Sequence, residues 1–272
     1  EVRFLNQVAV DGFDIKNAVI HNALAELQNG VKGMAGITMD ISAVKSVESG
    51  IEITRDTDID AEGYCIWEAG GILNLKASDA KGVLYGVFCI LRQIAMEKAL
   101  QGIHISCRPD NPLRMYNHWD NMDGSIERGY SGASFFFQDN EVLVDDRTKD
   151  YCRLVSSVGI NGVVINNVNV GGAATWLITE KYLEQVKKMA DLFAGYGIKL
   201  FLSLNFASSI EVGGLDNADP FDDRVIHWWK DKIAEIYEKI PDLGGFLVKA
   251  DSEGRPGPFT YGRTQADGAN ML

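Results

Sequence analysis

A lysine and two carboxylic acids follow an apolar run in the segment GGFLVKADSEG, residues 244–254. If this run is a strand, period-two alternation places Lys249, Asp251 and Glu253 on one side of it. A lysine ammonium binds anions, and a carboxylic acid donates a proton to a leaving group. The pattern therefore predicts an acid–base site with Lys249 as the anion-binding residue and Glu253 as the proton donor. A solvated ion pair at a strand end explains the same residues equally well.

The segment NHWDNMDGSIERGYSG, residues 117–132, gathers an imidazole, an indole, carboxylates and a guanidinium between glycines. Charged side chains in such loops commonly bond to the local backbone, and we expect this of most of them here. Trp119 differs, because a flat ring beside polar groups can stack on a sugar ring. This interpretation is favoured over core packing. The sequence leaves open whether the ring of His118 faces a site or a helix.

Polar residues also end two further apolar runs, GVVINNVN at 162–169 and IKLFLSLNF at 198–206, and Asn205 lies at the end of the latter. With the run LRMYNHWD and the fourth run at 244–254, four strand-like segments alternate with helical patterns. This alternation predicts a parallel sheet that is buried on both faces. In (β/α)8 barrels the active site lies at the carboxyl ends of the strands, so we expect Asn205 to contribute to the site.

Four parallel strands cannot close a barrel. We therefore expect residues 109–272 to form the first part of a (β/α)8 TIM-type catalytic barrel, with about four β/α units. The chain is then the front part of a longer protein. An open doubly wound sheet could stop at four strands, but the sequence contains no glycine-rich turn of the kind that binds nucleotides in such folds.

Residues 1–108 are expected to form a small α/β amino-terminal domain with a structural role. The segment NAVIHNALAELQNGVKG, residues 17–33, has apolar positions at helical spacing and is predicted to end at its glycines. GIEITRD and GILNLKASD alternate as half-buried strands do. A second helix is predicted to begin near Ser78 or Asp79.

The net charge of −12 and the pI of about 4.8 disfavour nucleic acid and anionic membranes as partners. No apolar stretch approaches the roughly 18 residues of a membrane span. The histidines and the four cysteines show no metal or disulfide spacing, so neither a metal nor another cofactor is expected. The compartment stays open between secreted, periplasmic and cytoplasmic.

Three long segments resemble the signature blocks of glycoside hydrolase family 67, the microbial α-glucuronidases. They are NHWDNMDGSIERGYSG, SLNFASSIEVGGLDNADPFD and GGFLVKADSEGRPGPFTYGRTQADGANML, and the resemblance runs from about Pro112 to the end. The first domain is similar to the small α/β domain that precedes the barrel in this family and in β-hexosaminidases.

The resemblance implies inverting removal of 4-O-methyl-glucuronic acid that is α-1,2-linked to the terminal xylose of xylo-oligosaccharides. The substrates would be aldouronic acids, and the reaction would need no metal. Whether the full-length protein forms a homodimer stays open. Glu253 matches the family's general acid, Lys249 a lysine that contacts the uronic acid, and Trp119 a tryptophan of the sugar pocket. His118, Asn205 and Asp251 complete the predicted substrate-binding residues.

Two positions depart from the family pattern. Asp251 stands where asparagine is expected, and Gln265 stands where histidine is expected. The extra carboxylate should disfavour the charged form of Glu253 or compete with Glu253 for Lys249.

An inverting enzyme also needs a second carboxylate, about 6.5–9.5 Å from the acid, to activate water. In the family this base role falls to an Asp and a Glu on later strands. We therefore expect the base beyond Leu272, and residues 1–272 alone to be inactive.

Two alternatives stay open, a second kind of glycosidase and a protein that is not an enzyme. A retaining hexosaminidase-type glycosidase would use an adjacent Asp–Glu pair together with the acetamido group of its substrate. The segment ADSEG lacks that contiguous pair, which argues against this alternative. A carbohydrate-binding protein without catalytic activity is the second, and cleavage of the bound oligosaccharide would exclude it.

Overall fold

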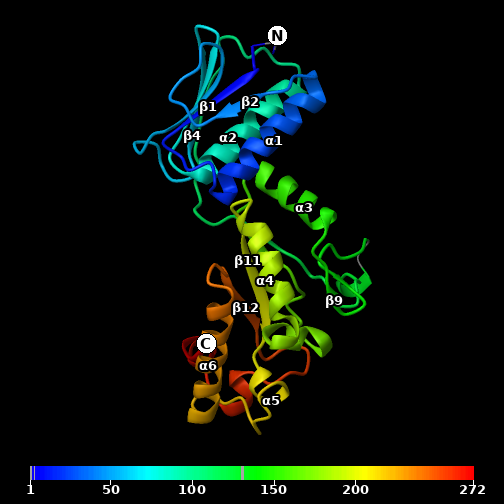
Figure 1. Ribbon diagram of the computed structural model, residues 1–272. Helices are drawn as coiled ribbons and strands as arrows, with labels where there is room; N and C mark the ends of the chain where they lie inside the picture. The colour runs from blue at the N-terminus through cyan, green and yellow to red at the C-terminus, as the bar shows by residue number, and fades with distance from the viewer. Residues whose placement is uncertain (1, 3, 130–131) are drawn as a thin grey trace. The chain divides into compact units, whose positions relative to one another are not determined.

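A computed structural model describes residues 2, 4–129 and 132–272. Residues 117–132, which lie at the end of the first of the four predicted barrel strands and after it, are called the first-strand loop. Tyr130 and Ser131 of this loop lie outside the described residues. The chain divides into two compact units (Figure 1). Unit 1 comprises Glu1–Arg114, Cys152–Asn161 and Ala194–Ile198, and unit 2 comprises Met115–Tyr151, Gly162–Phe193 and Lys199–Leu272. Each unit is described on its own.

Unit 1 contains a mixed six-stranded sheet in the order β2-β1-β3-β5-β4-β6. The pairs β1–β2, β1–β3 and β3–β5 are parallel, and β4 is antiparallel to both β5 and β6. Ile51, Ile53, Leu73 and Leu75 of the two central strands are fully buried, as their alternation predicts. The strands are β1 (Gln7–Asp11), β2 (Asp40–Ser42), β3 (Gly50–Arg55), β4 (Tyr64–Ala69), β5 (Ile72–Ala77) and β6 (His104–Cys107).

Two helices, α1 (Ala18–Ala35) and α2 (Ala80–Ala95), lie side by side in unit 1 (Figure 1). Asp79 caps α2 by accepting a hydrogen bond from the Gly82 N–H, as predicted. The prediction that α1 ends at its glycines is wrong, because the helix continues through Gly30 and is capped at Gly36, with φ 70°. Gly30 instead provides close packing: a Cβ there would lie 2.6 Å from Leu91 Cδ2 on α2.

Unit 2 contains a four-stranded, all-parallel sheet in the order β12-β11-β10-β7. Its strands are neighbours in chain order, as in the first half of a (β/α)8 barrel. They are β7 (Met115–Asn117), β10 (Gly162–Val164), β11 (Lys199–Asn205) and β12 (Gly245–Lys249). Each coincides with one of the four predicted apolar runs. The prediction that the sheet is buried on both faces is wrong for its two edge strands, because β7 is exposed and β12 is only partly buried.

Helices connect these strands, and Figure 1 shows α6 alongside β12. Tyr237 of α6 packs edge-on against Phe246 of β12, with ring centroids 6.0 Å apart. Trp229 of α6 is buried in the core. The long connecting helices are α3 (Asp146–Ser157), α4 (Glu180–Ala194) and α6 (Asp223–Lys239).

Shorter elements form the loops that follow the strands. After β7 come the 3-10 turn η1 (Glu127–Gly129) and the hairpin β8 (Phe137–Gln138) and β9 (Glu141–Val142). After β10 comes η2 (Gly172–Ile178), and after β11 the one-turn helix α5 (Ser208–Glu211). After β12 come η3 (Pro258–Tyr261) and α7 (Gln265–Met271). The carboxyl ends of the strands therefore carry the longest irregular segments, as expected of a barrel's functional face.

Candidate active site

Lys249 is the last residue of β12 and contacts two of the polar side chains around it. Its ammonium donates a hydrogen bond to Asn169 Oδ1 at 2.5 Å and forms an ion pair with Glu253 Oε1 at 3.1 Å. Both residues of the ion pair line one small pocket together with Asn205. The structure therefore brings together Lys249, Glu253 and Asn205, three of the six predicted site residues. The full lining is Val168, Asn169, Val170, Leu204, Asn205, Lys249, Ser252, Glu253 and Arg255.

The β12–η3 loop, residues 250–257, does not continue the strand. β12 ends at Lys249, and both Asp251 and Glu253 have left-handed backbones, with φ 52° and 56°. The expectation that alternation places Lys249, Asp251 and Glu253 on one strand face is therefore wrong beyond Lys249. The contact between Lys249 and Glu253 arises because the loop turns back, and not from a period of two.

Asp251 bonds to the segment that follows the loop. Its Oδ2 accepts hydrogen bonds from the Phe259 N–H at 3.2 Å and from Gln265 Nε2 at 2.7 Å. The two positions that depart from the family pattern thus contact each other. Among the bonds of the described residues, Lys249 pairs with Glu253 and not with Asp251, so the expected competition for Lys249 is not seen.

Asn205 is 3% exposed, and both ends of its amide are bonded within the protein. Its Nδ2 donates to Glu211 Oε1 at 2.8 Å, and its Oδ1 accepts from the Ala207 N–H at 3.0 Å. Glu211 also accepts hydrogen bonds from Thr175 Oγ1 at 3.1 Å and from Arg255 Nη1 at 3.0 Å. Asn205 therefore belongs to the wall of the pocket, and Glu211 and Arg255 are site residues that the sequence did not indicate.

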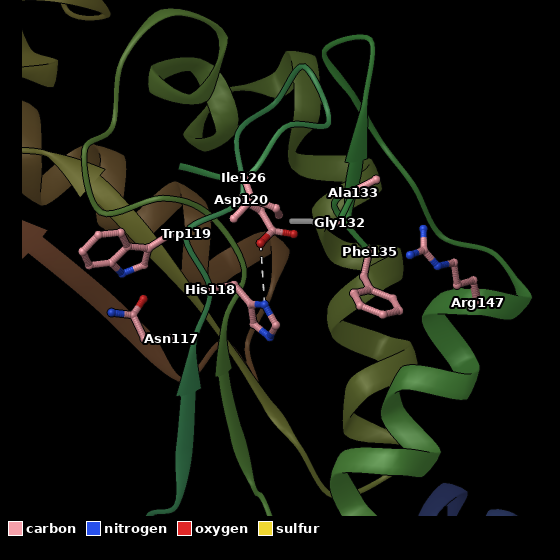
Figure 2. Close-up of a pocket in the computed structure, with 9 residues that line it drawn as sticks. All are labelled: Asn117, His118, Trp119, Asp120, Ile126, Gly132, Ala133, Phe135 and Arg147. Carbon is pink, nitrogen blue, oxygen red and sulfur yellow. Dashed lines mark ion pairs between the residues drawn. The ribbon is translucent and has the colours of Figure 1, made fainter. Parts of the chain in front are cut away.

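A second pocket lies beside the first-strand loop and contains Trp119, His118 and Asp120 (Figure 2). The Trp119 side chain lies on the same side as Asn117, and the His118 ring points the other way (Figure 2). Trp119 is 38% exposed, which excludes core packing. The complete lining is Asn117, His118, Trp119, Asp120, Ile126, Gly132, Ala133, Phe135 and Arg147.

The His118 ring faces α3, which answers the question that the sequence left open. Its Nε2 lies 2.5 Å from the Tyr151 hydroxyl oxygen, and its Nδ1 lies 3.6 Å from Asp120 Oδ1. The ring also packs edge-on against Phe136, with centroids 5.0 Å apart. Asp120 is 3% exposed and accepts a hydrogen bond from Ser134 Oγ at 2.6 Å. His118 is therefore part of a packed aromatic and polar cluster.

Glu127 joins the first-strand loop to the end of β10. Its carboxylate accepts hydrogen bonds from Asn167 Nδ2 and, at 3.4 Å, from Asn169 Nδ2. Asn169 in turn accepts from Lys249. Because Nδ2 of Asn169 faces Glu127, the amide oxygen of Asn169 faces the ammonium of Lys249. The polar side chains after β7, β10 and β12 therefore form one connected network.

No group of three or more His, Cys, Asp or Glu side chains suitable for a metal ion is found among the described residues. Within the same residues, no helix combines the length and apolar character of a membrane span. The ammonium of Lys249 can bind an anion, and the carboxyl group of Glu253 can transfer a proton.

Known proteins share both the sequence and the fold of this chain. Residues 93–272 match the "Glycosyl hydrolase family 67 middle domain". Alpha-glucuronidase A of Emericella nidulans is 41% identical over 93% of this chain and 32% of its own length. The alpha-glucuronidase of Hypocrea jecorina is 40% identical over 94% of this chain and 33% of its own length. The chain thus spans about a third of the length of these relatives.

Solved structures of glycosidases share the fold of this chain at low sequence identity. A β-hexosaminidase of Streptomyces plicatus has a TM-score of 0.63 and 15% identity over 98% of this chain and 60% of its own. A family GH115 4-O-methyl-α-glucuronidase has a TM-score of 0.60 and 14% identity over 93% of this chain and 37% of its own. The predicted fold class, a small α/β region followed by about four β/α units of a TIM-type barrel, is confirmed.

Proposed function

Because this chain belongs to glycosyl hydrolase family 67, we propose that the whole protein is an α-glucuronidase. Its relatives of about 40% identity carry that name. Its proposed substrates are aldouronic acids, xylo-oligosaccharides in which 4-O-methyl-glucuronic acid is α-1,2-linked to xylose. The proposed reaction inverts the anomeric configuration and requires no metal.

The observation that carries this proposal is the contact between Lys249 and Glu253. An ammonium and a carboxylate, 3.1 Å apart, lie together at the carboxyl end of a parallel strand. A uronic acid presents a carboxylate close to its glycosidic bond, so it needs a cation and a proton donor at short range. This pair supplies both groups within one pocket.

In the proposed reaction the substrate carboxylate takes the place of Glu253 as the partner of Lys249. Glu253, in its protonated form, then donates its proton to the glycosidic oxygen as the bond from C1 to that oxygen breaks. Water adds to C1 from the opposite face, and a carboxylate base accepts its proton. The products are the free uronic acid and a xylo-oligosaccharide with a restored hydroxyl. Glu253 then regains a proton from solvent, and the base releases to solvent the proton that it accepted. Trp119 offers its exposed ring as a sugar platform.

Substitution Glu253→Gln in the full-length protein tests the proposal. Removing a general acid should lower kcat/KM on aldouronic acids by about 10²- to 10⁴-fold. The loss should be much smaller on an aryl α-glucuronide whose leaving group needs no proton. Glu238→Gln, at an exposed position on α6, is the matched control and should leave turnover unchanged. Equal losses on both substrates would remove the acid role from Glu253, and a wild-type protein without activity would refute the proposed function.

A further inference from the structure

Arg255 lies against the backbone of another strand's loop. A Cβ atom at Gly171 would be only 1.8 Å from Arg255 Nη2 and 2.7 Å from its Cζ. The guanidinium therefore occupies space that any residue except glycine would fill. The guanidinium also forms an ion pair with Glu211, at 3.0 Å between Nη1 and Oε1. The loop after β10 and the helix α5 after β11 together hold the Arg255 side chain.

Arg255 stands two residues after Glu253, in a turn whose conformation needs support. Glu253 has φ 56° and Gly254 has φ 70°, and the Arg255 N–H donates to the Ser252 oxygen at 3.1 Å. The left-handed region is disfavoured for residues with a Cβ, so Glu253 keeps this backbone only if contacts around it enforce it. Its own side chain contributes the ion pair with Lys249, which the proposed reaction breaks.

Contacts of side chains on both sides of Glu253 fix the turn. Two residues before it, Asp251 is bonded to Phe259 and Gln265. Two residues after it, Arg255 is bonded to Glu211. Glu211 is itself oriented by hydrogen bonds from Asn205 and Thr175, which belong to different strand ends. Glu211 therefore connects the ends of β10 and β11 to the turn that carries the proposed acid.

We propose that Glu211 and Arg255 are positioning residues for Glu253, with Gly171 providing the space that Arg255 requires. The inference rests on the proposed function, because it assigns a role toward the acid of that reaction. Arg255 and Glu211 are 34% and 38% exposed, and ion pairs between such groups contribute little to global stability. The pair is consequently suited to orienting a loop and adds little to the stability of the fold.

Gly171→Ala tests this arrangement without altering either charged residue. Gly171 has φ −169° and ψ 171°, an extended conformation that alanine adopts without strain. The added methyl group must displace the Arg255 guanidinium, which is the flexible end of a side chain. The variant should therefore fold normally, with its Tm within about 2 °C of the wild type. Gly33→Ala, at a position on α1 with open space around the missing Cβ, is the matched control.

The experiment compares wild type, Gly171→Ala, Arg255→Ala and the double variant in the full-length protein. Two quantities are measured: turnover of an aldouronic acid, and hydrogen–deuterium exchange of the peptide that contains residues 251–257. Each single variant should lower kcat by about tenfold or more, because small displacements of a catalytic group are costly, and should change KM less than twofold. Exchange of the peptide should become faster. Gly171→Ala should have no further effect in the Arg255→Ala background.

Three results would overturn the inference. One is unchanged kcat and unchanged exchange in Gly171→Ala. Another is a rise in KM with constant kcat, which would make Arg255 a direct ligand of the substrate. The third is a fully additive double variant, which would show that Gly171 acts independently of Arg255. If the wild-type protein does not cleave aldouronic acids, the proposed function fails, and the exchange measurement alone decides whether Gly171 and Arg255 order the loop.

Discussion

The Gln265 side-chain amide donates a hydrogen bond to the Asp251 carboxylate, with 2.7 Å between Nε2 and Oδ2. The bond joins the β12–η3 loop to the first residue of α7. The loop is also closed by Gly257, where a Cβ would lie 2.3 Å from the Asp251 backbone nitrogen. Asp251 thus acts as a link between the loop and the segment after it.

We predict that Gln265→Glu destabilises this link because it places two carboxylates at hydrogen-bond distance. The free energy of unfolding should fall by about 1 kcal/mol at neutral pH. The penalty should be smaller in the Asp251→Asn background, because the new amide can donate a hydrogen bond to the introduced carboxylate in place of the lost bond.

Urea unfolding of the four proteins in this double-mutant cycle measures the coupling between the two side chains. Equal penalties in both backgrounds would show that Asp251 and Gln265 are not coupled.

Glu62 is a buried carboxylate in unit 1, and three side chains hold it. It is 9% exposed, bonds to Lys81 at 2.6 Å, to Asn161 Nδ2 at 3.1 Å, and forms an ion pair with Arg114. Burial acts to raise the pKa of Glu62, but the hydrogen bonds from Lys81 and Arg114 outweigh it and lower the pKa below its ordinary value of 4.5. The charged form of Glu62 therefore stabilises the folded state.

Glu62→Gln should lower the free energy of unfolding by about 2 kcal/mol at pH 7, since it leaves two cations without their partner. Because the folded pKa lies below the unfolded one, this contribution is complete above about pH 4.5 and is lost as the pH falls through the folded pKa. The difference between wild type and variant should therefore shrink below about pH 4.5.

Urea unfolding curves of both proteins at pH 7, 4.5 and 3.5 check this. A difference that is constant over that range would mean that the charge of Glu62 contributes nothing to stability.

Trp119→Ala should weaken sugar binding without destabilising the protein, since the ring is 38% exposed. Loss of an aromatic platform should raise the Kd for an aldouronic acid by about tenfold, which corresponds to about 1.4 kcal/mol. Calorimetric titration measures the Kd, and thermal unfolding reports the stability. Trp67→Ala, on β4 of unit 1, is the control for removal of an indole and should leave the Kd unchanged. An unchanged Kd for Trp119→Ala would remove this residue from the sugar site.

The apolar runs were sufficient to predict the four strands of the parallel sheet in unit 2, because each run ends at polar residues. The predicted burial on both faces holds for β10 and most of β11, whereas β7 is exposed and β12 is partly buried. The same pattern also predicted that Lys249 lies at the end of a strand, and Lys249 is the last residue of β12. The pattern failed at Asp251 and Glu253, because bonds from Phe259 and Gln265, which come later in the chain, end the extended conformation.

Contacts between distant segments account for the other differences. Glu211 and Arg255 are 44 residues apart, and no periodic pattern connects a one-turn helix after β11 with a loop after β12. Gly30 looked like a helix end because glycine is a poor helix former, but the Leu91 side chain of a second helix occupies the space beside it. Such residues can be identified only when the packing partner is known.

Asn169 is predicted to determine how well Lys249 binds a uronic acid carboxylate. Its Oδ1 accepts from the ammonium at 2.5 Å, and its Nδ2 donates to Glu127 at 3.4 Å, which fixes the direction of the amide. Asn169→Ala should leave the charge of Lys249 in place but free its side chain to move. We expect the Kd for glucuronate to rise by about threefold to tenfold, and by more in Lys249→Ala, where the cation is lost. Affinity for neutral xylo-oligosaccharides should not change in either variant, because they carry no carboxylate. Calorimetric titration with glucuronate and with xylotriose compares the two ligands. An equal loss of affinity for both would mean that Asn169 supports the general shape of the pocket and has no specific role in orienting the ammonium.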